Sequence, residues 1–269
     1  METPQSLGII AGSGAYPLLV ARSARKAGVK KIAAAAFTGE TDPKLAADVD
    51  EIEWMRVGQL ARLLSFFRST GVRHAMMAGQ IAPKNLFDLR PDWKALLLLA
   101  RLQRRNAESI FGGIADELAN AGIELLPATT FLNDCVAQRG RIAGPPLKRR
   151  EEADVSFGLE IAREMARLDV GQTVIVKNGT VVAVEAFEGT NEAIKRGGAL
   201  ARKNAVVVKV AKANQDMRFD VPVIGVQTIE AAAEAGMRVI AVEAGRTLLL
   251  ERAEIIAVAE RAGISVVGC

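Results

Sequence analysis

The chain opens with a short apolar run, Leu7–Ala11, followed directly by the glycine turn Gly12-Ser13-Gly14. After the turn, Pro17–Lys26 carries apolar residues at helical spacing and cations near its end. A strand, a glycine turn and a helix in this order form the first unit of a doubly wound sheet. Such a turn lets a backbone or a ligand approach closely, with helix N–H groups facing an anion. The turn therefore predicts either a ligand contact or a tight backbone packing site.

Two features disfavour a dinucleotide at this turn. Pro17 stands where a G-x-G-x-x-G motif would have its third glycine, and no acidic residue ends the next strand-like run, Lys31–Phe37. The motif uses that glycine for close packing and the acid for the ribose hydroxyl. An oxidoreductase with a nucleotide cofactor therefore stays only as an alternative.

Strand-like runs alternate with amphipathic helical segments along both halves of the chain, which predicts two α/β domains. The first, 1–133, is expected to hold a Rossmann-like parallel sheet. Residues 134–150 are rich in glycine, proline and cations, and we predict a linker there. The second domain, 151–269, is predicted to be mixed α/β and to open with a hairpin, because two alternating runs flank Asn178-Gly179.

Composition limits the classes of function. The net charge of +4 fits anionic ligands or an anionic surface, whereas an aromatic content of 4% argues against base-stacking platforms and so against a nucleic-acid partner. The single histidine, His74, has no cysteine or histidine cluster with which to bind zinc. Two distant cysteines, Cys135 and Cys269, and the lack of an apolar run of about 18 residues predict a cytoplasmic protein.

One leucine-rich segment, Lys94–Arg101, has helical periodicity with a cation at each end. Its length and spacing predict a mainly buried helix. Contact with a membrane surface is the alternative, because amphipathic helices with basic ends also lie on membranes.

Two acidic residues, Glu185 and Glu188, follow a run that we predict to be a central strand. A carboxylate buried there needs a cation, a metal or a hydrogen-bonded partner. Thr190 and Asn191 come next, at the start of a predicted helix, where either one is a good N-cap.

The segment Lys209–Thr228 lies between two strand-like runs and has few large apolar residues. Its polar side chains include Lys209, Lys212, Gln215, Asp216, Arg218 and Asp220. Two carboxylates among three cations suit a metal or phosphate site better than a core. A solvated loop with local ion pairs fits the same residues equally well, so the residues alone do not choose between Asp216 and Asp220.

Carboxyl ends of parallel strands meet at one edge of a sheet. Three polar groups of the second half are expected to converge in this way: Glu185 with Glu188, the Lys209–Asp220 loop, and Glu243 with Arg246. In the first half, Gln80 and Lys84 follow the strand-like run His74–Ala78, although a surface loop explains them equally well.

Five segments, in order and spread over nearly the whole chain, match one known family. They are LGIIAGSGAYP at 7–17, AGQIAP at 78–83, RLDVGQTVIVKNGTVVAVEAFEGTNEAI at 167–194, KVAKANQDMRFDVPVIGVQTI at 209–229 and VEAGRTLLLER at 242–252. In these segments the chain resembles the UDP-2,3-diacylglucosamine pyrophosphatases of the LpxI type, metal-dependent hydrolases of lipid A biosynthesis. EAFEGTN and QDMRFDVPVIG are the specific segments, whereas the glycine turn alone is a weak signal.

The resemblance implies that water attacks the α-phosphorus of UDP-2,3-diacylglucosamine, giving UMP and 2,3-diacylglucosamine 1-phosphate with the help of Mg²⁺ or Mn²⁺. In the family, the acid of the R-x-D element before the V/L-P-x-I-G segment is the metal-linked catalytic residue. That position is Asp220 in this chain, and Asp216 falls on a neighbouring acidic position.

These arguments together give three sets of expected site residues. Catalytic roles are expected for Asp220, Lys212 and Arg218. Substrate contacts are expected from Gly12, Ser13, Gly14, Gln80, Thr190, Asn191, Lys209 and Gln215. Metal ligands are expected among Asp220, Glu185, Glu188 and Asp216.

The expected setting is the cytoplasm, in peripheral contact with the inner membrane, because the basic chain could stay near anionic lipid without an anchor. A homodimer is expected from base rates alone. Besides the oxidoreductase, the second alternative is a non-catalytic protein that binds a lipid or a nucleotide sugar.

Overall fold

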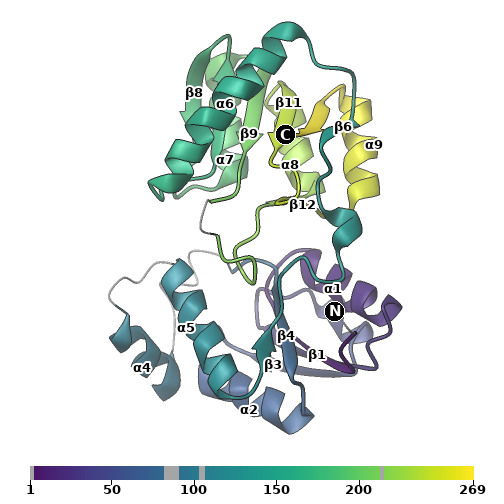
Figure 1. Ribbon diagram of the computed structural model, residues 1–269, viewed down its shortest axis with the longest axis vertical. Coiled ribbons are helices and arrows are strands. Elements are labelled where there is room, and N and C mark those ends of the chain that lie inside the picture. The colour runs from purple at the N-terminus through teal and green to yellow at the C-terminus, as the bar shows by residue number, and fades with distance from the viewer. Residues whose placement is uncertain (1–2, 82–90, 103–106, 213–214) are drawn as a thin grey trace. The chain divides into compact units, whose positions relative to one another are not determined.

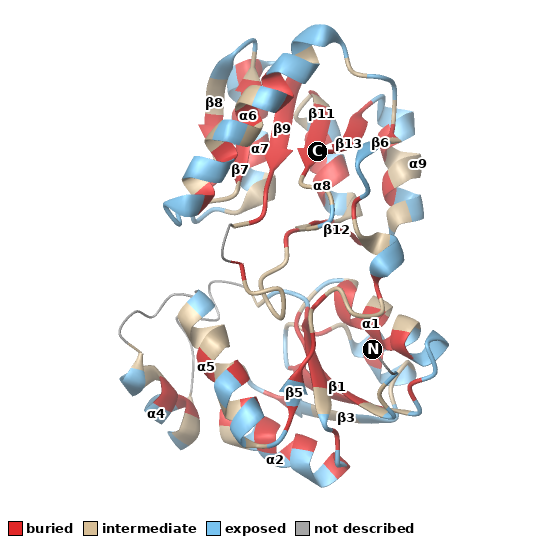
Figure 2. Ribbon diagram, viewed as in Figure 1, coloured by how far each residue is buried: buried red, intermediate tan, exposed pale blue. Residues whose placement is uncertain are grey.

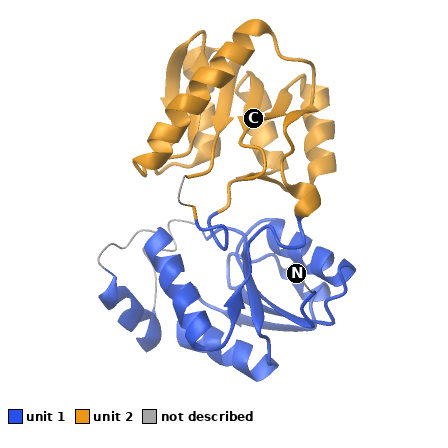
Figure 3. Cartoon of the chain, viewed as in Figure 1, with its two compact units in different colours: residues 1–132, 216–220 blue, residues 133–215, 221–269 orange. Residues whose placement is uncertain are grey.

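The computed structural model describes residues 3–81, 91–102, 107–212 and 215–269, so that Lys84 lies outside the described residues. The chain forms two compact units (Figure 3). Unit 1 contains residues 1–132 and 216–220, and unit 2 contains residues 133–215 and 221–269. The five residues 216–220 therefore belong to unit 1, although the chain on either side of them belongs to unit 2.

Unit 1 is built on a parallel sheet with the strand order β3-β2-β1-β4-β5 (Figure 1). Its strands are β1 (Ser6–Ala11), β2 (Lys31–Phe37), β3 (Glu51–Met55), β4 (His74–Ala78) and β5 (Glu124–Leu125). Its helices are α1 (Tyr16–Lys26), η1 (Pro43–Ala47), α2 (Leu60–Thr70), α4 (Trp93–Arg101) and α5 (Ala107–Asn120). This is the predicted Rossmann-like sheet, with strand, glycine turn and helix at its start.

The core of unit 1 lies on both faces of this sheet. On one face, buried side chains of α2, α4 and α5 pack with Ala33, Ala35 and Met77. Helix α1 contacts β1 and β4, and its buried residues lie outside that cluster, so it covers the opposite face. Strands β1, β2 and β4 are almost fully buried in the interior of the unit (Figure 2). Chain order reverses at β1 and β4, whose carboxyl ends form the crevice where doubly wound sheets bind ligands.

Unit 2 is built on a mixed sheet with the strand order β6-β13-β11-β9-β7-β8 (Figure 1). The strands of this sheet are β6 (Gly140–Ala143), β7 (Thr173–Lys177), β8 (Thr180–Val184), β9 (Ala205–Lys209), β11 (Met237–Val242) and β13 (Ser265–Gly268). A small parallel pair is formed by β10 (Val223–Ile224) and β12 (Leu248–Leu249). The helices are η2 (Asn133–Cys135), α6 (Arg149–Arg167), α7 (Thr190–Ala201), α8 (Val226–Glu234) and α9 (Arg252–Ala262).

Alternate side chains of the central strand β9 enter two separate cores. Val206 and Val208 pack with α6 on one face, whereas Val207 packs with α7, α8 and α9 on the other. All five residues of β9 are buried, as expected for a strand that has helices on both faces. The prediction of two α/β folds, the second opening with a hairpin, is confirmed.

The hairpin between β7 and β8 turns at Asn178-Gly179, as the sequence predicts. Both residues have positive φ angles, 50° and 73°, which suit asparagine and glycine in a tight hairpin turn. The buried carboxylate of Asp154 on α6 accepts hydrogen bonds from both backbone N–H groups, at 2.8 and 2.7 Å. Helix α6 thereby fixes the turn.

Two predictions about the ends of unit 2 differ from the structure. The segment 134–150, predicted to be a linker, contains β6, which pairs with β13 and closes one edge of the sheet. Strand β8, predicted to be central, is the opposite edge strand, because β7 pairs antiparallel with both β8 and β9. Local composition did not reveal these positions, because they depend on the distant pairings of β6 with β13 and of β7 with β9.

The leucine-rich helix α4 is another difference. Ala95 and Leu98 are buried as predicted, but Trp93, Leu96 and Leu97 are exposed, so the prediction of a mainly buried helix is wrong (Figure 2). No helix among the described residues is both long and apolar enough to cross a membrane.

Candidate active site

In unit 1, the loops that follow β1 and β4 are joined at the carboxyl edge of the sheet. The backbone N–H of Ser13 donates to the carbonyl of Gln80 at 2.7 Å, and the Ser13 hydroxyl donates to the same carbonyl at 2.9 Å. A Cβ on Gly12 would lie 2.5 Å from the Gln80 carbonyl oxygen, and one on Gly79 would lie 2.6 Å from that of Ser13. Both glycines are therefore needed for the close backbone packing between the two loops.

Gly14 differs from Gly12, because it lies at the open side of the turn. Its φ is 85°, it is exposed, and a Cβ there would meet no atom within 4 Å. Helix α1 starts two residues later, and no side chain caps its N-terminus. The turn thus presents backbone rather than side chains at this edge.

The segment Asp216–Asp220 is fixed to the same edge by contacts with residues far away in the sequence. The N–H of Ala128, in the loop after β5, donates to the carbonyl of Met217 at 2.7 Å. The carbonyl of Ala128 in turn accepts a hydrogen bond from the hydroxyl of Tyr16, the first residue of α1. The Phe219 ring packs on Phe111 of α5 with centroids 5.8 Å apart. These contacts explain why five residues leave unit 2 for unit 1.

The two carboxylates of this segment have different environments. Asp216 binds its neighbour Arg218 in a fork, with Arg218 Nε 2.9 Å from Asp216 Oδ1 and Nη2 2.6 Å from Oδ2. The Arg218 backbone N–H also donates to Asp216 Oδ1, at 3.0 Å. Hydrogen bonding from the Arg218 guanidinium lowers the pKa of Asp216 below 3.8 despite partial burial, and raises that of Arg218.

Asp220 is held through its backbone only. Its N–H donates to the carbonyl of Asp216 at 2.9 Å, which closes the turn. Within the described part of the chain, no group donates to its half-buried carboxylate. Arg218 likewise has an Nη1 group that binds no acceptor in the described residues. The segment therefore offers one open carboxylate beside one cation with a free donor.

In unit 2, a hydroxyl connects a buried acid with a buried base. Thr190 Oγ1 donates to Glu185 Oε1 at 2.8 Å and accepts from Lys209 Nζ at 2.8 Å. Glu185 and Lys209 are 8% and 7% exposed, so both charges are largely removed from water. Oε2 of Glu185 is buried and has no hydrogen-bond partner among the residues that the structure describes. A buried carboxylate oxygen without a hydrogen-bond partner costs free energy unless a ligand binds it.

The fold places this cluster at the carboxyl edge of the second sheet. Glu185 follows β8, Lys209 ends β9, and the N–H of Glu185 donates to the carbonyl of Thr173 at 2.8 Å. Gly189, with a φ of 85°, is the N-cap of α7. Thr190 is therefore the first helical residue and is not the predicted N-cap, so its hydroxyl is available to bridge Glu185 and Lys209. Asn191 follows on α7, half-buried and without a side-chain hydrogen bond in the described structure.

Glu188 forms a salt bridge with Arg196. Its Oε1 lies 2.5 Å from Arg196 Nη2, and its Oε2 accepts from the N–H of Ala186 at 3.0 Å. The hydrogen bond from Arg196 lowers the pKa of Glu188 below its ordinary 4.5. Glu188 thus braces the loop between β8 and α7.

The loop after β9 is also tied to its neighbours. Lys212 forms a salt bridge with Asp169, and its N–H donates to the side-chain carbonyl of Gln215 at 2.8 Å. Arg246 Nη2 donates to the Lys212 carbonyl at 2.9 Å, and Glu243 Oε2 accepts from the N–H of Ala211 at 2.9 Å. The expected convergence of polar groups therefore occurs in unit 2, except that Asp216–Asp220 belong to unit 1.

The expected metal ligands do not form a cage. No group of three or more His, Cys, Asp or Glu side chains suited to a metal occurs among the residues that the structure describes. Asp216 and Glu188 are occupied by arginines, so Asp220 and Glu185 are the two of the four that keep an open oxygen.

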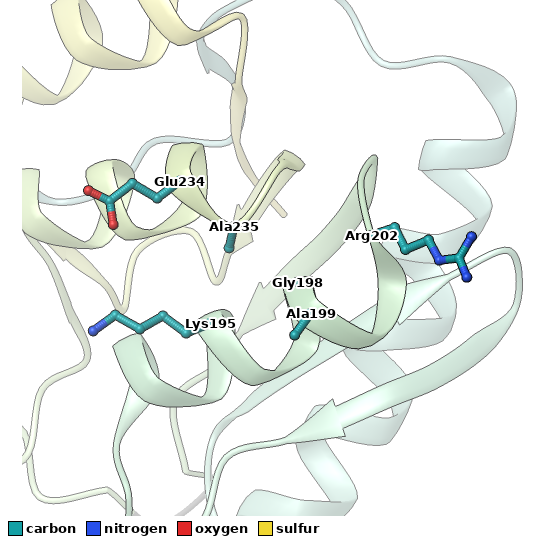
Figure 4. A pocket seen from close by; sticks show the side chains of 6 residues that line it. All are labelled: Lys195, Gly198, Ala199, Arg202, Glu234 and Ala235. Atoms are coloured by element: carbon teal, nitrogen blue, oxygen red, sulfur yellow. The ribbon is translucent and has the colours of Figure 1, made fainter.

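A separate hollow in unit 2 plays no part in this arrangement. It has a volume of about 460 Å³, lies between α7 and α8, and is lined by Lys195, Gly198, Ala199, Arg202, Glu234 and Ala235. Figure 4 shows Arg202 directed away from Lys195 and Glu234. None of the expected site residues lines it.

Four residues that position the expected site residues were not predicted from the sequence. They are Ala128, Tyr16, Thr173 and Asp169. Ala128 acts through its backbone, which no residue type reveals. Asp169 lies in the segment 167–194 that matches a known family, so that match was the available signal for it.

Comparison with known proteins covers both units. The family model for the LpxI N-terminal domain matches residues 6–135, and that for the LpxI C-terminal domain matches residues 138–267. A curated relative from Caulobacter vibrioides, UDP-2,3-diacylglucosamine pyrophosphatase LpxI, is 33% identical over 279 residues, which cover 98% of this chain and 97% of the relative.

Likeness to solved structures is weak. The biotin carboxylase domain of Hydrogenobacter thermophilus 2-oxoglutarate carboxylase aligns with a TM-score of 0.30 and 11% identity, over 71% of this chain and 37% of that chain. The biotin carboxylase subunit of a pyruvate carboxylase aligns with a TM-score of 0.29 and 15% identity, over 74% and 42%. The two family models and the curated relative, by contrast, extend over nearly all of the sequence. The chain therefore belongs to the LpxI family.

Proposed function

We propose that this chain hydrolyses UDP-2,3-diacylglucosamine to UMP and 2,3-diacylglucosamine 1-phosphate in lipid A synthesis. Water adds to the α-phosphorus, and the bond from that phosphorus to the bridging oxygen breaks. The bridging oxygen leaves with the sugar phosphate, and the oxygen of the water stays on UMP. Membership of the LpxI family and the activity named for the Caulobacter relative support this substrate.

The observation that carries the proposal is that Asp220 combines a fixed backbone with an unbound carboxylate. Its backbone is fixed by the turn from Asp216 and by the anchoring of Met217 and Phe219, yet its carboxylate is free of protein donors in the described structure. A catalytic acid has this combination of a rigid backbone and an unoccupied functional group. Asp220 is also the position that matches the acid of the family's R-x-D element.

The residues fit a divalent cation of the Mg²⁺ or Mn²⁺ type. Mg²⁺ is commonly held by one or two carboxylates together with substrate phosphates, so a cage of three acids is not required. In unit 1, Asp220 would hold the cation together with the substrate phosphates. In unit 2, Glu185 is the acid that keeps an open oxygen among the described residues. When bound, the cation would neutralise charge on the diphosphate and make a bound water more acidic.

The remaining residues act on the charge of the substrate. In unit 1, Arg218 is fixed by Asp216 and would offer its Nη1 group to a phosphate oxygen. In unit 2, Lys209 and Lys212 supply positive charge. Such fixed donors stabilise the negative charge that grows on the phosphorus oxygens. Further substrate contacts are proposed for Ser13, Gly14 and Gln80 in unit 1, and for Asn191 and Gln215 in unit 2.

The test is release of UMP by the purified protein. UDP-2,3-diacylglucosamine dispersed in detergent is supplied with Mg²⁺ or Mn²⁺, and UMP and the lipid phosphate are measured by chromatography. We expect stoichiometric release of both products, which a chelator stops and added metal restores. Absence of release with several divalent metals would refute the proposed function, and release unaffected by the chelator would refute the proposed cofactor.

A further inference from the structure

Helix α4 has two apolar faces, and the described part of the chain covers only one of them. Ala95 and Leu98 point inward and are 8% and 9% exposed, in contact with the core of α2 and α5. Trp93, Leu96 and Leu97 are 64%, 55% and 49% exposed. An amphipathic helix of a globular protein normally carries polar side chains on its outer face. The outer face of α4 is apolar, which indicates that another apolar surface binds there.

The charged groups around this outer face are arranged asymmetrically. The acids turn inward: Asp92 caps the helix by accepting from the N–H groups of Lys94 and Ala95, at 3.1 and 3.0 Å. Glu117 of α5 is 14% exposed and lies 2.6 Å from Lys94 Nζ. The Arg101 side chain is 73% exposed at the other end of the helix. Helix α4 itself therefore carries two cations, Lys94 and Arg101, and no acid beside its apolar side chains.

Among the described residues, the open hollow along this face is lined by Trp93, Leu96, Leu97, Leu99 and Ala100. Tryptophan prefers the boundary between lipid head groups and acyl chains, because its ring is apolar and its N–H is polar. Leucines penetrate just below that boundary, and arginine binds lipid phosphates above it. The chemistry of the face thus matches the surface of an anionic phospholipid bilayer.

The dimensions argue against other partners. A nine-residue helix is about 13 Å long and presents a strip about 10 Å wide, whereas a stable dimer buries about 800 Å² on each partner. The strip alone is too small for a second copy of the chain. It is also far shorter than the roughly 30 Å of a bilayer core, so α4 can lie only in the plane of the surface.

We infer that α4 docks the protein on anionic membranes, with Trp93, Leu96 and Leu97 inserted at the level of the head groups and Arg101 on the phosphates. The purpose of this docking rests on the proposed function, because a substrate with two acyl chains resides in a membrane. The docking itself is a property of the surface and can be measured without substrate.

The experiment measures binding to vesicles by sedimentation and by tryptophan fluorescence. The Trp54→Phe background leaves Trp93 as the single tryptophan. Vesicles of phosphatidylcholine are compared with vesicles that also contain phosphatidylglycerol. We expect a blue shift of Trp93 emission and sedimentation with the anionic vesicles, and both effects should weaken at high salt.

The variant Leu96→Ser/Leu97→Ser should lower the apparent affinity for anionic vesicles by about tenfold or more, because two leucine side chains no longer leave water. Arg101→Ala should lower it by about fivefold. The matched control is Leu168→Ser/Leu200→Ser, two leucines of unit 2 that are 55% and 63% exposed, which should bind like the parent. All of these positions are exposed, so the folds should survive.

Four outcomes would overturn the inference. They are no blue shift with anionic vesicles, equal loss of binding in the control pair, loss of a dimer in gel filtration as the only effect of the α4 variant, and a raised KM for detergent-dispersed substrate with unchanged vesicle binding. The third would assign the face to a second copy and the fourth to the acyl chains of the substrate. Failure of UMP release by the parent protein would refute the proposed function while leaving the vesicle result to stand by itself.

Discussion

Each unit holds a pair of acids close together in sequence, and in each pair an arginine occupies one acid while the other keeps an open oxygen. In unit 1, Arg218 binds Asp216 and leaves Asp220 open. In unit 2, Arg196 binds Glu188 and leaves Oε2 of Glu185 open. An acid whose oxygens are already paired can brace a loop, but it has little left to offer a ligand.

The two open acids differ in what surrounds them. Asp220 is half-buried at a turn and receives no hydrogen bond from the described residues. Glu185 is buried, and its other oxygen is bound to Thr190, which is bound in turn to Lys209. The first arrangement suits a carboxylate that meets water, metal or phosphate directly, and the second suits one that orients a neighbouring cation. The difference predicts a graded response to mutation.

The largest effect is expected for Asp220→Asn. The amide keeps the shape of the side chain but loses the charge, so kcat should fall by about a thousandfold. The melting temperature should stay that of the parent, because the Asp220 carboxylate binds nothing in the described structure. Steady-state rates of UMP release and thermal unfolding measure the two. Activity within a few-fold of the parent would remove Asp220 from the proposed mechanism.

A smaller effect is expected for Glu185→Gln. The amide can still accept from Thr190, but it no longer balances the charge of Lys209, and we expect kcat to fall by about thirtyfold with a modest change in KM. Thr190→Ser should behave like the parent because it keeps the bridging hydroxyl, whereas Thr190→Ala should approach Glu185→Gln. Equal loss in Thr190→Ser and Thr190→Ala would show that packing, and not the hydroxyl, matters there.

The sequence predicted the frameworks that carry these acids. Strand, glycine turn and helix at the start, and the hairpin at Asn178-Gly179, follow from local residue preferences, and the structure has both. The parallel sheet followed from the alternation of strands and helices. These features succeed because each depends on residues within one or two elements.

Placement of the Asp216–Asp220 segment could not be predicted in the same way. It depends on the bond from Ala128 to Met217 and on the packing of Phe219 against Phe111, across about ninety residues or more of chain. The residues alone also gave no choice between Asp216 and Asp220, because only the geometry shows which one Arg218 occupies. Family resemblance pointed to Asp220, and the structure adds a physical difference between the two.

A milder loss is expected for Asp216→Asn, which releases Arg218. The arginine loses its fixed position, so kcat should fall by about tenfold while Asp220 remains. The pKa of Asp216 is lowered from 3.8, so its contribution to stability is complete above pH 3.8 and disappears as the pH falls through the lower pKa of the folded state. Unfolding curves of parent and variant should therefore differ by a constant amount at neutral pH and converge only below pH 3.8. Convergence already near pH 6 would contradict the assignment of the Asp216–Arg218 pair.

The smallest effect is expected for Glu188→Gln. This variant tests whether an arginine-bound acid matters less than an acid with an open oxygen. The side chains of Glu188 and Arg196 are 31% and 49% exposed, and exposed ion pairs contribute little to stability. Because Arg196 also donates to the carbonyl of Val184 at 2.8 Å, it stays in place without its acid. We expect UMP release within about twofold of the parent, as for other surface changes away from a site. A loss as large as that of Glu185→Gln would mean that the arginine-bound acid, and not the one with the open oxygen, serves the substrate in unit 2. Asp216, and not Asp220, would then be the acid of unit 1 that is expected to serve the substrate.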